Sequence, residues 1–172
     1  MVLPVVEQLR RNGVVVALGG SGLLKSLGLV EGVRDWDLTS DAPWEQVEPA
    51  LAGLDWRPAP CGDGPFASQY RIAIAAGDKE IDLMGEFAIR TEAGVVALPT
   101  VVCSQWQGLP VGSPEVWAVA YRLMERHAKA DLLSGWLREN GARVEMVERL
   151  LREPLPAGVR ADVDKWPRRA RM

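Results

Sequence analysis

The sequence predicts an α/β (α+β) protein in which a short mixed sheet is flanked by helices, with further helices towards the C-terminus. Three observations support this fold class. A continuous apolar run at 14–18, rich in β-branched residues, is followed by a glycine-rich turn and a helical segment. Two apolar segments, 67–75 and 79–84, are joined by a Gly-Asp pair that is typical of a hairpin. From residue 113 onward the spacing of apolar residues becomes helical.

The first half of the chain alternates between helical and extended patterns. Gly13 ends the first helical segment, and Pro43 stands where a helix begins. The expected elements are, in order, helix 4–12, strand 14–18, a turn at 19–22, helix 23–29, strand 34–39 and helix 44–51.

The second half begins with strands and continues with helices. Pro99 interrupts one extended segment, and Ser113-Pro114 is a typical helix start. The expected elements are strands 54–59, 67–75 and 79–84, one or two short strands within 95–102, a helix from 113 to about 133, and more helix to 151 with a break near 140–141. We therefore divide the chain into a core (1–108), a C-terminal helical part of the same domain (109–153), and a basic tail (154–172), loosely packed or docked by Trp166 alone.

Composition narrows the possible functions. With 172 residues, 48% of them apolar, the chain can form one well-buried core. The net charge of −3 gives no global basic field for nucleic acid. No apolar run approaches the roughly 20 residues needed to span a bilayer, and no basic segment leads into an apolar one at the N-terminus. A cytoplasmic location without membrane contact is therefore predicted.

Cysteine and histidine are too few for common metal sites. Cys61 and Cys103 are far apart and lack a Cys-x-x-Cys spacing, so we expect two reduced thiols. His127 is the single histidine, which excludes a site with several histidines.

Three acids lie within otherwise apolar strands. Asp35 and Asp37 alternate with apolar residues, so in a strand both project from one face, and Asp82 has the same arrangement in a later strand. Carboxylates on one face repel each other unless a cation lies between them, and three acids can hold two divalent ions. The alternatives are a solvated strand edge, or ion pairs with Arg34 and Arg71.

The glycine-rich turn offers a second possible contact with phosphate. Gly19, Gly20, Ser21 and Gly22 precede a helix, and helix N-termini attract anions. A plain tight turn is the alternative. A P-loop would need glycine directly before Lys25-Ser26, and this chain has leucine there. Lys25 is then expected on the helix surface, from which it could reach phosphate.

The order of these motifs resembles small bacterial members of the DNA polymerase β-like nucleotidyltransferase superfamily. Gly20-Ser21, with Gly19-Gly20 as an alternative register, is followed by Asp35-Trp36-Asp37-Leu38 and later by Glu80-Ile81-Asp82-Leu83. The resemblance covers residues 14–85, and more weakly the helix at 113–132.

The resemblance implies Mg²⁺-dependent transfer of a nucleoside monophosphate from a nucleoside triphosphate to a hydroxyl, with release of pyrophosphate. Asp35 and Asp37 would bind two Mg²⁺ ions, and Asp82 would complete the ion nearer the acceptor. Ser21, with the amides of Gly20 and Gly22, would contact the β- and γ-phosphates. A non-catalytic nucleotide-binding or partner-binding module with the same fold is the alternative.

The resemblance also implies basic side chains on the helix at 116–133. Arg122, Arg126 and Lys129 are spaced to share one helical face towards the triphosphate. The alternative is a solvated face with Glu125 and Asp131 as partners.

The acceptor is not identified by these motifs. Among resembling proteins it can be an aminoglycoside-type small molecule, an RNA 3′ end, or a protein side chain in a toxin–antitoxin pair. The tail could hold an RNA backbone or serve only as a solubilising terminus. Its basic residues are Arg160, Lys165, Arg168, Arg169 and Arg171, opposed by Asp162 and Asp164.

Overall fold

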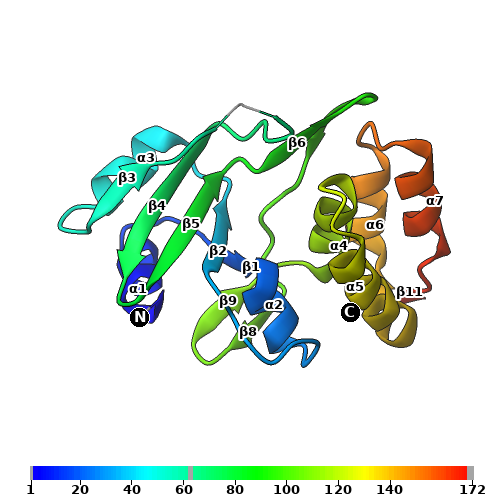
Figure 1. Ribbon diagram of the computed structural model, residues 1–172, viewed down its shortest axis with the longest axis horizontal. Coiled ribbons are helices and arrows are strands. Elements are labelled where there is room, and N and C mark those ends of the chain that lie inside the picture. Colours follow the sequence, from blue (N-terminus) through cyan, green and yellow to red (C-terminus); the bar gives the residue numbers. More distant parts are fainter. Residues whose placement is uncertain (1, 62–63, 170–172) are drawn as a thin grey trace.

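A seven-stranded mixed sheet forms the centre of the computed structural model, which describes residues 2–61 and 64–169 (Figure 1). The strand order is β3-β4-β5-β2-β1-β9-β8. These strands are β1 (Ala17–Gly19), β2 (Trp36–Ser40), β3 (Trp56–Pro58), β4 (Tyr70–Ala76), β5 (Lys79–Gly85), β8 (Ser104–Trp106) and β9 (Leu109–Val111). The short mixed sheet predicted from the sequence is confirmed.

The middle of the sheet determines which side chains share a face. β2 runs parallel to β5 and antiparallel to β1, and the predicted hairpin joins β4 to β5. In this register Asp37 lies directly opposite Asp82. Because side chains alternate along each strand, the two acids project from the same face.

The helices form two groups, as Figure 1 shows. α1 and α3 lie at the left with the sheet, α2 lies beside β1 and β2 near its middle, and α4 to α7 pack together at the right. The helices are α1 (Val2–Arg11), α2 (Gly20–Ser26), α3 (Trp44–Ala50), α4 (Pro114–Leu123), α5 (His127–Asn140), α6 (Val144–Leu151) and α7 (Ala157–Lys165). Two small strand pairs complete the fold, β6 (Ala88–Thr91) with β7 (Gly94–Ala97) and β10 (Ala142–Arg143) with β11 (Arg168–Arg169).

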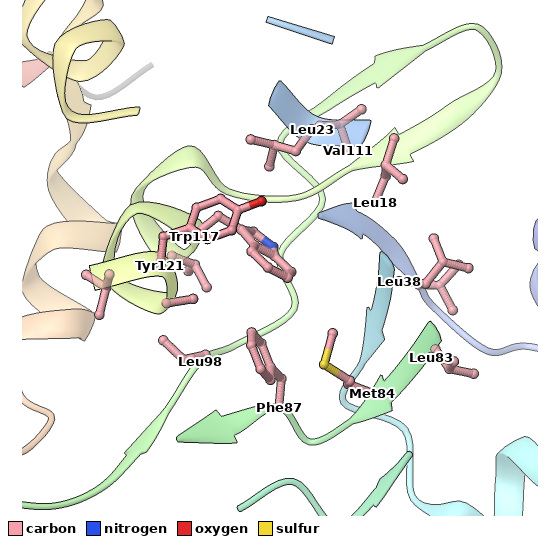
Figure 2. Close-up of a cluster of buried hydrophobic side chains, with 14 of the residues drawn as sticks. Leu18, Leu23, Leu38, Leu83, Met84, Phe87, Leu98, Val111, Trp117 and Tyr121 are labelled. Atoms are coloured by element: carbon pink, nitrogen blue, oxygen red, sulfur yellow. The ribbon is translucent and has the colours of Figure 1, made fainter. Parts of the chain in front are cut away.

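Aromatic side chains of α4 connect the helical group to the sheet. Figure 2 shows Trp117 and Tyr121 directed towards Phe87 and the leucines of the sheet. The ring centroids of Trp117 and Phe87 are 5.3 Å apart, and those of Trp117 and Tyr121 are 5.6 Å apart. All three side chains are buried. A single core therefore fixes α4 relative to the strands that carry the acids.

The continuous helix predicted for 113–133 is wrong, because the chain breaks it after Leu123. Glu125 adopts a positive φ of 60°. The amide of Arg126 donates to the carbonyl of Tyr121, at 2.8 Å, as in a Schellman-type helix end. That position usually holds glycine, so no local signal in the sequence marks a break here.

The tail predicted at 154–172 is neither loosely packed nor docked by Trp166 alone in the described residues 154–169, so that prediction is also wrong. α7 buries Val159 and Val163, and Trp166 is 2% exposed. The guanidinium of Arg160 donates to the carbonyls of Leu151 and Glu153, at 2.8 and 2.9 Å. Spacing of four residues between the two valines gives α7 an apolar face. The Pro, Gly and Arg content of the segment concealed this pattern; Arg171 lies outside the described residues.

The two cysteines and the lengths of the helices bear on two further predictions. Cys61 and Cys103 are both free, which confirms the prediction of unpaired thiols. Within the described part of the chain, no helix has the length and apolar character needed to cross a membrane.

Candidate active site

A cavity of about 710 Å³ lies where the acid-bearing strands face α4 and α5. Its polar wall combines carboxylates with basic side chains, and its apolar wall includes both aromatic and aliphatic residues. Its lining includes Ser21, Arg34, Asp35, Asp37, Arg57, Phe66, Arg71, Glu80, Asp82, Tyr121, Arg126 and Lys129.

All three predicted acids line this cavity. Asp37 and Asp82 are partners across β2 and β5. β2 begins at Trp36 rather than at residue 34, so exposed Asp35 lies just before the strand. The predicted shared face therefore holds within the sheet for Asp37 and Asp82, while Asp35 reaches the same cavity from the preceding loop.

The Asp37 carboxyl group is in an environment that disfavours its charged form. Burial raises the pKa of Asp37 to about 7, and repulsion by Asp82 and Asp35 adds to this effect. The positive charges of Lys129 and Arg71 act in the opposite direction but do not cancel it. A bound cation would favour the ionised carboxylate here.

Asp82 is held by an arginine from the neighbouring strand. The Arg71 guanidinium donates from Nε to Oδ1 at 2.9 Å, and from Nη2 to Oδ2 at 2.6 Å. This hydrogen bonding to Asp82 raises the pKa of Arg71. The ion pair with Arg71 that the sequence left as an alternative is thus present for Asp82, whereas Arg34 forms no ion pair with these acids among the described residues.

The acids fit a metal ion only in part. Carboxylate oxygens are the ligands that Mg²⁺ prefers, and Asp35 and Asp37 both reach the cavity. However, within residues 2–61 and 64–169 no three side chains of Asp, Glu, His or Cys lie close enough to share an ion. The arrangement suits a cation beside Asp35 and Asp37, and it leaves Asp82 engaged with Arg71.

The glycine-rich turn packs closely against the core. α2 begins at Gly20, earlier than predicted, and half-buried Ser21 lines the cavity. A Cβ atom on Gly19 would lie 2.1 Å from the Trp117 ring, and one on Gly22 would lie 2.7 Å from Leu18. A side chain at either place would force Trp117 or Leu18 to move.

Lys25 does not reach this cavity in the described structure. Its side chain is exposed on α2 and is absent from the described cavity lining. The expectation that Lys25 lies on the helix surface is confirmed, and its contact with phosphate stays a prediction.

The three basic residues of the C-terminal helices do not share one face, so that prediction is wrong. Lys129 and Arg126 line the cavity, and Lys129 Nζ lies 5.6 Å from the centre of the Tyr121 ring. Arg122 instead pairs with Asp131 at 2.8 Å and with Asp162 at 3.3 Å. The break after α4 explains the difference, because it separates Arg122 from the other two residues.

The sequence did not predict the apolar wall of the cavity. Phe66, Phe87 and Tyr121 line it, together with Met84 and Trp117. Spacing of four residues between Trp117 and Tyr121 indicated only a buried helix face. Only the packing of Trp117 against Phe87 and Gly19 places part of that face at a cavity.

Comparison with known proteins supports the fold. No protein-family model and no curated protein matches the sequence. Among solved structures, a candidate nucleotidyltransferase (TM1012) from Thermotoga maritima is 21% identical, with a TM-score of 0.55 over 79% of this chain and 89% of that one. ANT(2″)-Ia in complex with adenylyl-2″-tobramycin is 17% identical, with a TM-score of 0.53 over 86% and 94% of the two chains.

A solution structure of ANT(2″)-Ia gives the same result, with 18% identity and a TM-score of 0.52 over 91% of this chain and 85% of that one. At such identities the likeness is one of fold. The chain is a small protein with the nucleotidyltransferase fold, as its motifs indicated.

Proposed function

We propose that this protein transfers a nucleoside monophosphate from a nucleoside triphosphate to a hydroxyl acceptor, with Mg²⁺, and releases pyrophosphate. The observation that carries the proposal is the pairing of Asp37 with Asp82 on adjacent parallel strands that face one cavity. Asp35, Ser21 and Lys129 line the same cavity. Nucleotidyl transfer brings several negative charges together, and this set of residues can position and balance them.

Each group would have a defined task. Asp35 and Asp37 would hold Mg²⁺, which when bound neutralises phosphate charge. Ser21, Arg126 and Lys129 would contact the triphosphate. The acceptor oxygen forms a bond to the α-phosphorus, its proton passes to a carboxylate of the site such as Asp82, and the bond from the α-phosphorus to pyrophosphate breaks.

The balance of charged residues in the cavity indicates which charge the acceptor molecule can carry. Of its described lining residues, five are basic (Arg34, Arg57, Arg71, Arg126, Lys129) and four are acidic (Asp35, Asp37, Glu80, Asp82). Once the acids hold metal, little negative charge is left for a cationic acceptor such as an aminoglycoside. We therefore favour a neutral or anionic small molecule with an apolar part that packs on Phe66.

The other acceptors have less support. Arg160 and Arg168 donate hydrogen bonds to backbone carbonyls within the C-terminal segment, so they are not free to bind an RNA backbone. The structural neighbours give no support for a protein partner of the toxin–antitoxin kind, and we do not propose one. RNA ends and protein hydroxyls are included as acceptors in the test below. A cytoplasmic location stays a prediction.

The test is direct. The purified protein is incubated with Mg²⁺ and each α-labelled nucleoside triphosphate, with small-molecule, RNA or protein acceptor pools, and label transfer and pyrophosphate are both measured. Acceptor-dependent release that disappears in Asp37→Ala supports the proposal. Equal release by parent and variant would contradict it.

A second candidate function is a nucleotide-binding module without transfer activity. It is favoured by the ion pair in which Arg71 engages both Asp82 oxygens. Tight, Mg²⁺-dependent nucleotide binding without transfer to any acceptor pool would support this alternative over the enzyme.

A further inference from the structure

The Arg71 side chain occupies the side of the site where a second metal ion would be needed. Arg71 lies on β4 opposite Met84, and Asp82 is two residues before Met84 on β5. The two charged side chains are therefore diagonal neighbours on one face of the sheet. Each is only about a quarter exposed, at 26% and 25%.

The guanidinium of Arg71 is held from three directions. Nε and Nη2 bind the Asp82 carboxylate, with Nε 2.9 Å from Oδ1 and 3.1 Å from Oδ2. Nη1 donates to the carbonyl of Pro60 at 3.3 Å. The guanidinium carbon lies 5.2 Å from the centre of the Phe66 ring. An arginine fixed in this way is a permanent positive charge with a defined position.

Asp82 differs from Asp35 and Asp37 in whether its carboxylate forms an ion pair. Asp82 has both oxygens engaged by Arg71, whereas among the described residues no ion pair forms to Asp37 or Asp35. A metal ion beside Asp35 and Asp37 would therefore displace no existing ion pair. An ion at Asp82 would have to break a two-point ion pair that is largely shielded from water.

We propose that the site takes one divalent ion, at Asp35 and Asp37, and that Arg71 supplies the positive charge on the acceptor side in place of a second ion. This inference rests on the proposed function and specifies how that site is charged. Arg71 would donate hydrogen bonds to the acceptor oxygen as its negative charge develops. Asp82 would position Arg71 rather than bind metal.

The test counts bound Mn²⁺ per chain by isothermal titration and by electron paramagnetic resonance, with the full chain and α,β-methylene-ATP. The parent is expected to bind one ion. Asp82→Asn is expected to keep that ion, because Asp82 is not its ligand. Arg71→Met should bind two ions, because Asp82 is then free, and the double variant should return to one.

A second arginine of the same cavity provides a matched control. Arg57 on β3 forms a comparable ion pair with Glu80 at 2.8 Å, but the two side chains are 62% and 53% exposed. Arg57→Met removes one positive charge without freeing Asp82, so this variant should still bind one Mn²⁺ ion per chain. If Arg71→Met does not fold, Arg71→Gln replaces it with the same expected count of two.

The possible outcomes separate the inference from the function. Two ions in the parent, loss of the single ion in Asp82→Asn, or one ion in the folded Arg71 variant would each overturn the role of Arg71. No Mn²⁺ binding by the parent in the presence of the triphosphate analogue would instead contradict the proposed function itself.

Discussion

Gly20 provides the space that the Asp37 carboxylate occupies. A Cβ atom built on Gly20 would lie 2.0 Å from Oδ2 of Asp37, well inside van der Waals contact. Gly20 also has a φ of +57°, in the left-handed region that glycine adopts without strain. The first residue of α2 thus helps to position an acid of β2, in addition to any contact that the turn makes with phosphate.

Gly20→Ala should therefore displace the Asp37 carboxylate and abolish Mg²⁺-dependent nucleotide binding. Gly28→Ala is the matched control, because Gly28 has a φ of +76° and nothing within 4 Å of a Cβ atom. Both substitutions carry the backbone cost of about 1–2 kcal/mol. Only Gly20→Ala also brings a Cβ atom against the Asp37 carboxylate, so calorimetric titration should show loss of nucleotide binding in this variant alone. Equal nucleotide affinity in the two variants would show that the clash is relieved elsewhere.

Asp37→Asn should stabilise the protein at high pH when metal is absent. Asp37 binds its proton more tightly in the folded state, where its pKa is about 7, than at its ordinary value of 3.8. The folded state therefore holds more protons between about pH 4 and pH 7, and stability falls as pH rises through this range. The variant lacks this loss and should be roughly 2–4 kcal/mol more stable near pH 8, with no difference near pH 4.

Urea unfolding of parent and variant at both pH values, in EDTA, measures this difference. Asp78→Asn, in the exposed turn between β4 and β5, controls for the loss of one negative charge. Equal stability of parent and Asp37→Asn near pH 8 would contradict the raised pKa. The same proton linkage predicts that Mg²⁺ affinity of the parent rises with pH up to about 7, because the metal competes with the proton.

Lys129→Ala should weaken triphosphate binding about tenfold, the effect of losing one charge-assisted contact. Arg122→Ala should leave this affinity unchanged, because Arg122 pairs with Asp131 and Asp162 away from the cavity. Arg122→Ala should instead lower the Tm, because it removes these two ion pairs. Titration of each variant with a triphosphate analogue distinguishes them, and a larger loss of affinity in Arg122→Ala would reverse the assignment.

Trp166→Ala should destabilise the fold by about 3–5 kcal/mol, because a large buried side chain leaves a cavity. Trp166 is 2% exposed, whereas Leu132 of α5 is 39% exposed, so Leu132→Ala serves as the control with a small effect. Urea unfolding gives both values. A loss below 1 kcal/mol for Trp166→Ala would mean that the C-terminal segment contributes little to the core.

Local sequence patterns were sufficient for the elements whose signals are local. The hairpin turn at Gly77-Asp78 and the helix start at Ser113-Pro114 depend on backbone preferences of a few residues, and both were predicted from the sequence. Local patterns did not predict the elements in which packing overrides such backbone preferences. The helix end at Glu125 has no glycine, and the apolar face of α7 lies within a segment rich in Pro, Gly and Arg.

In the candidate site, too, some features follow from local sequence patterns and others depend on tertiary contacts. The placement of Asp37 and Asp82 in apolar strands, with their side chains on a predictable face, follows from the amino-acid pattern, because alternation along a strand is a local property. The folded chain was needed to show that these two acids are partners, that Arg71 engages Asp82, and that Lys129 but not Arg122 lines the cavity. Strand order and the position of a helix depend on contacts between segments far apart in the chain, and no local pattern specifies them.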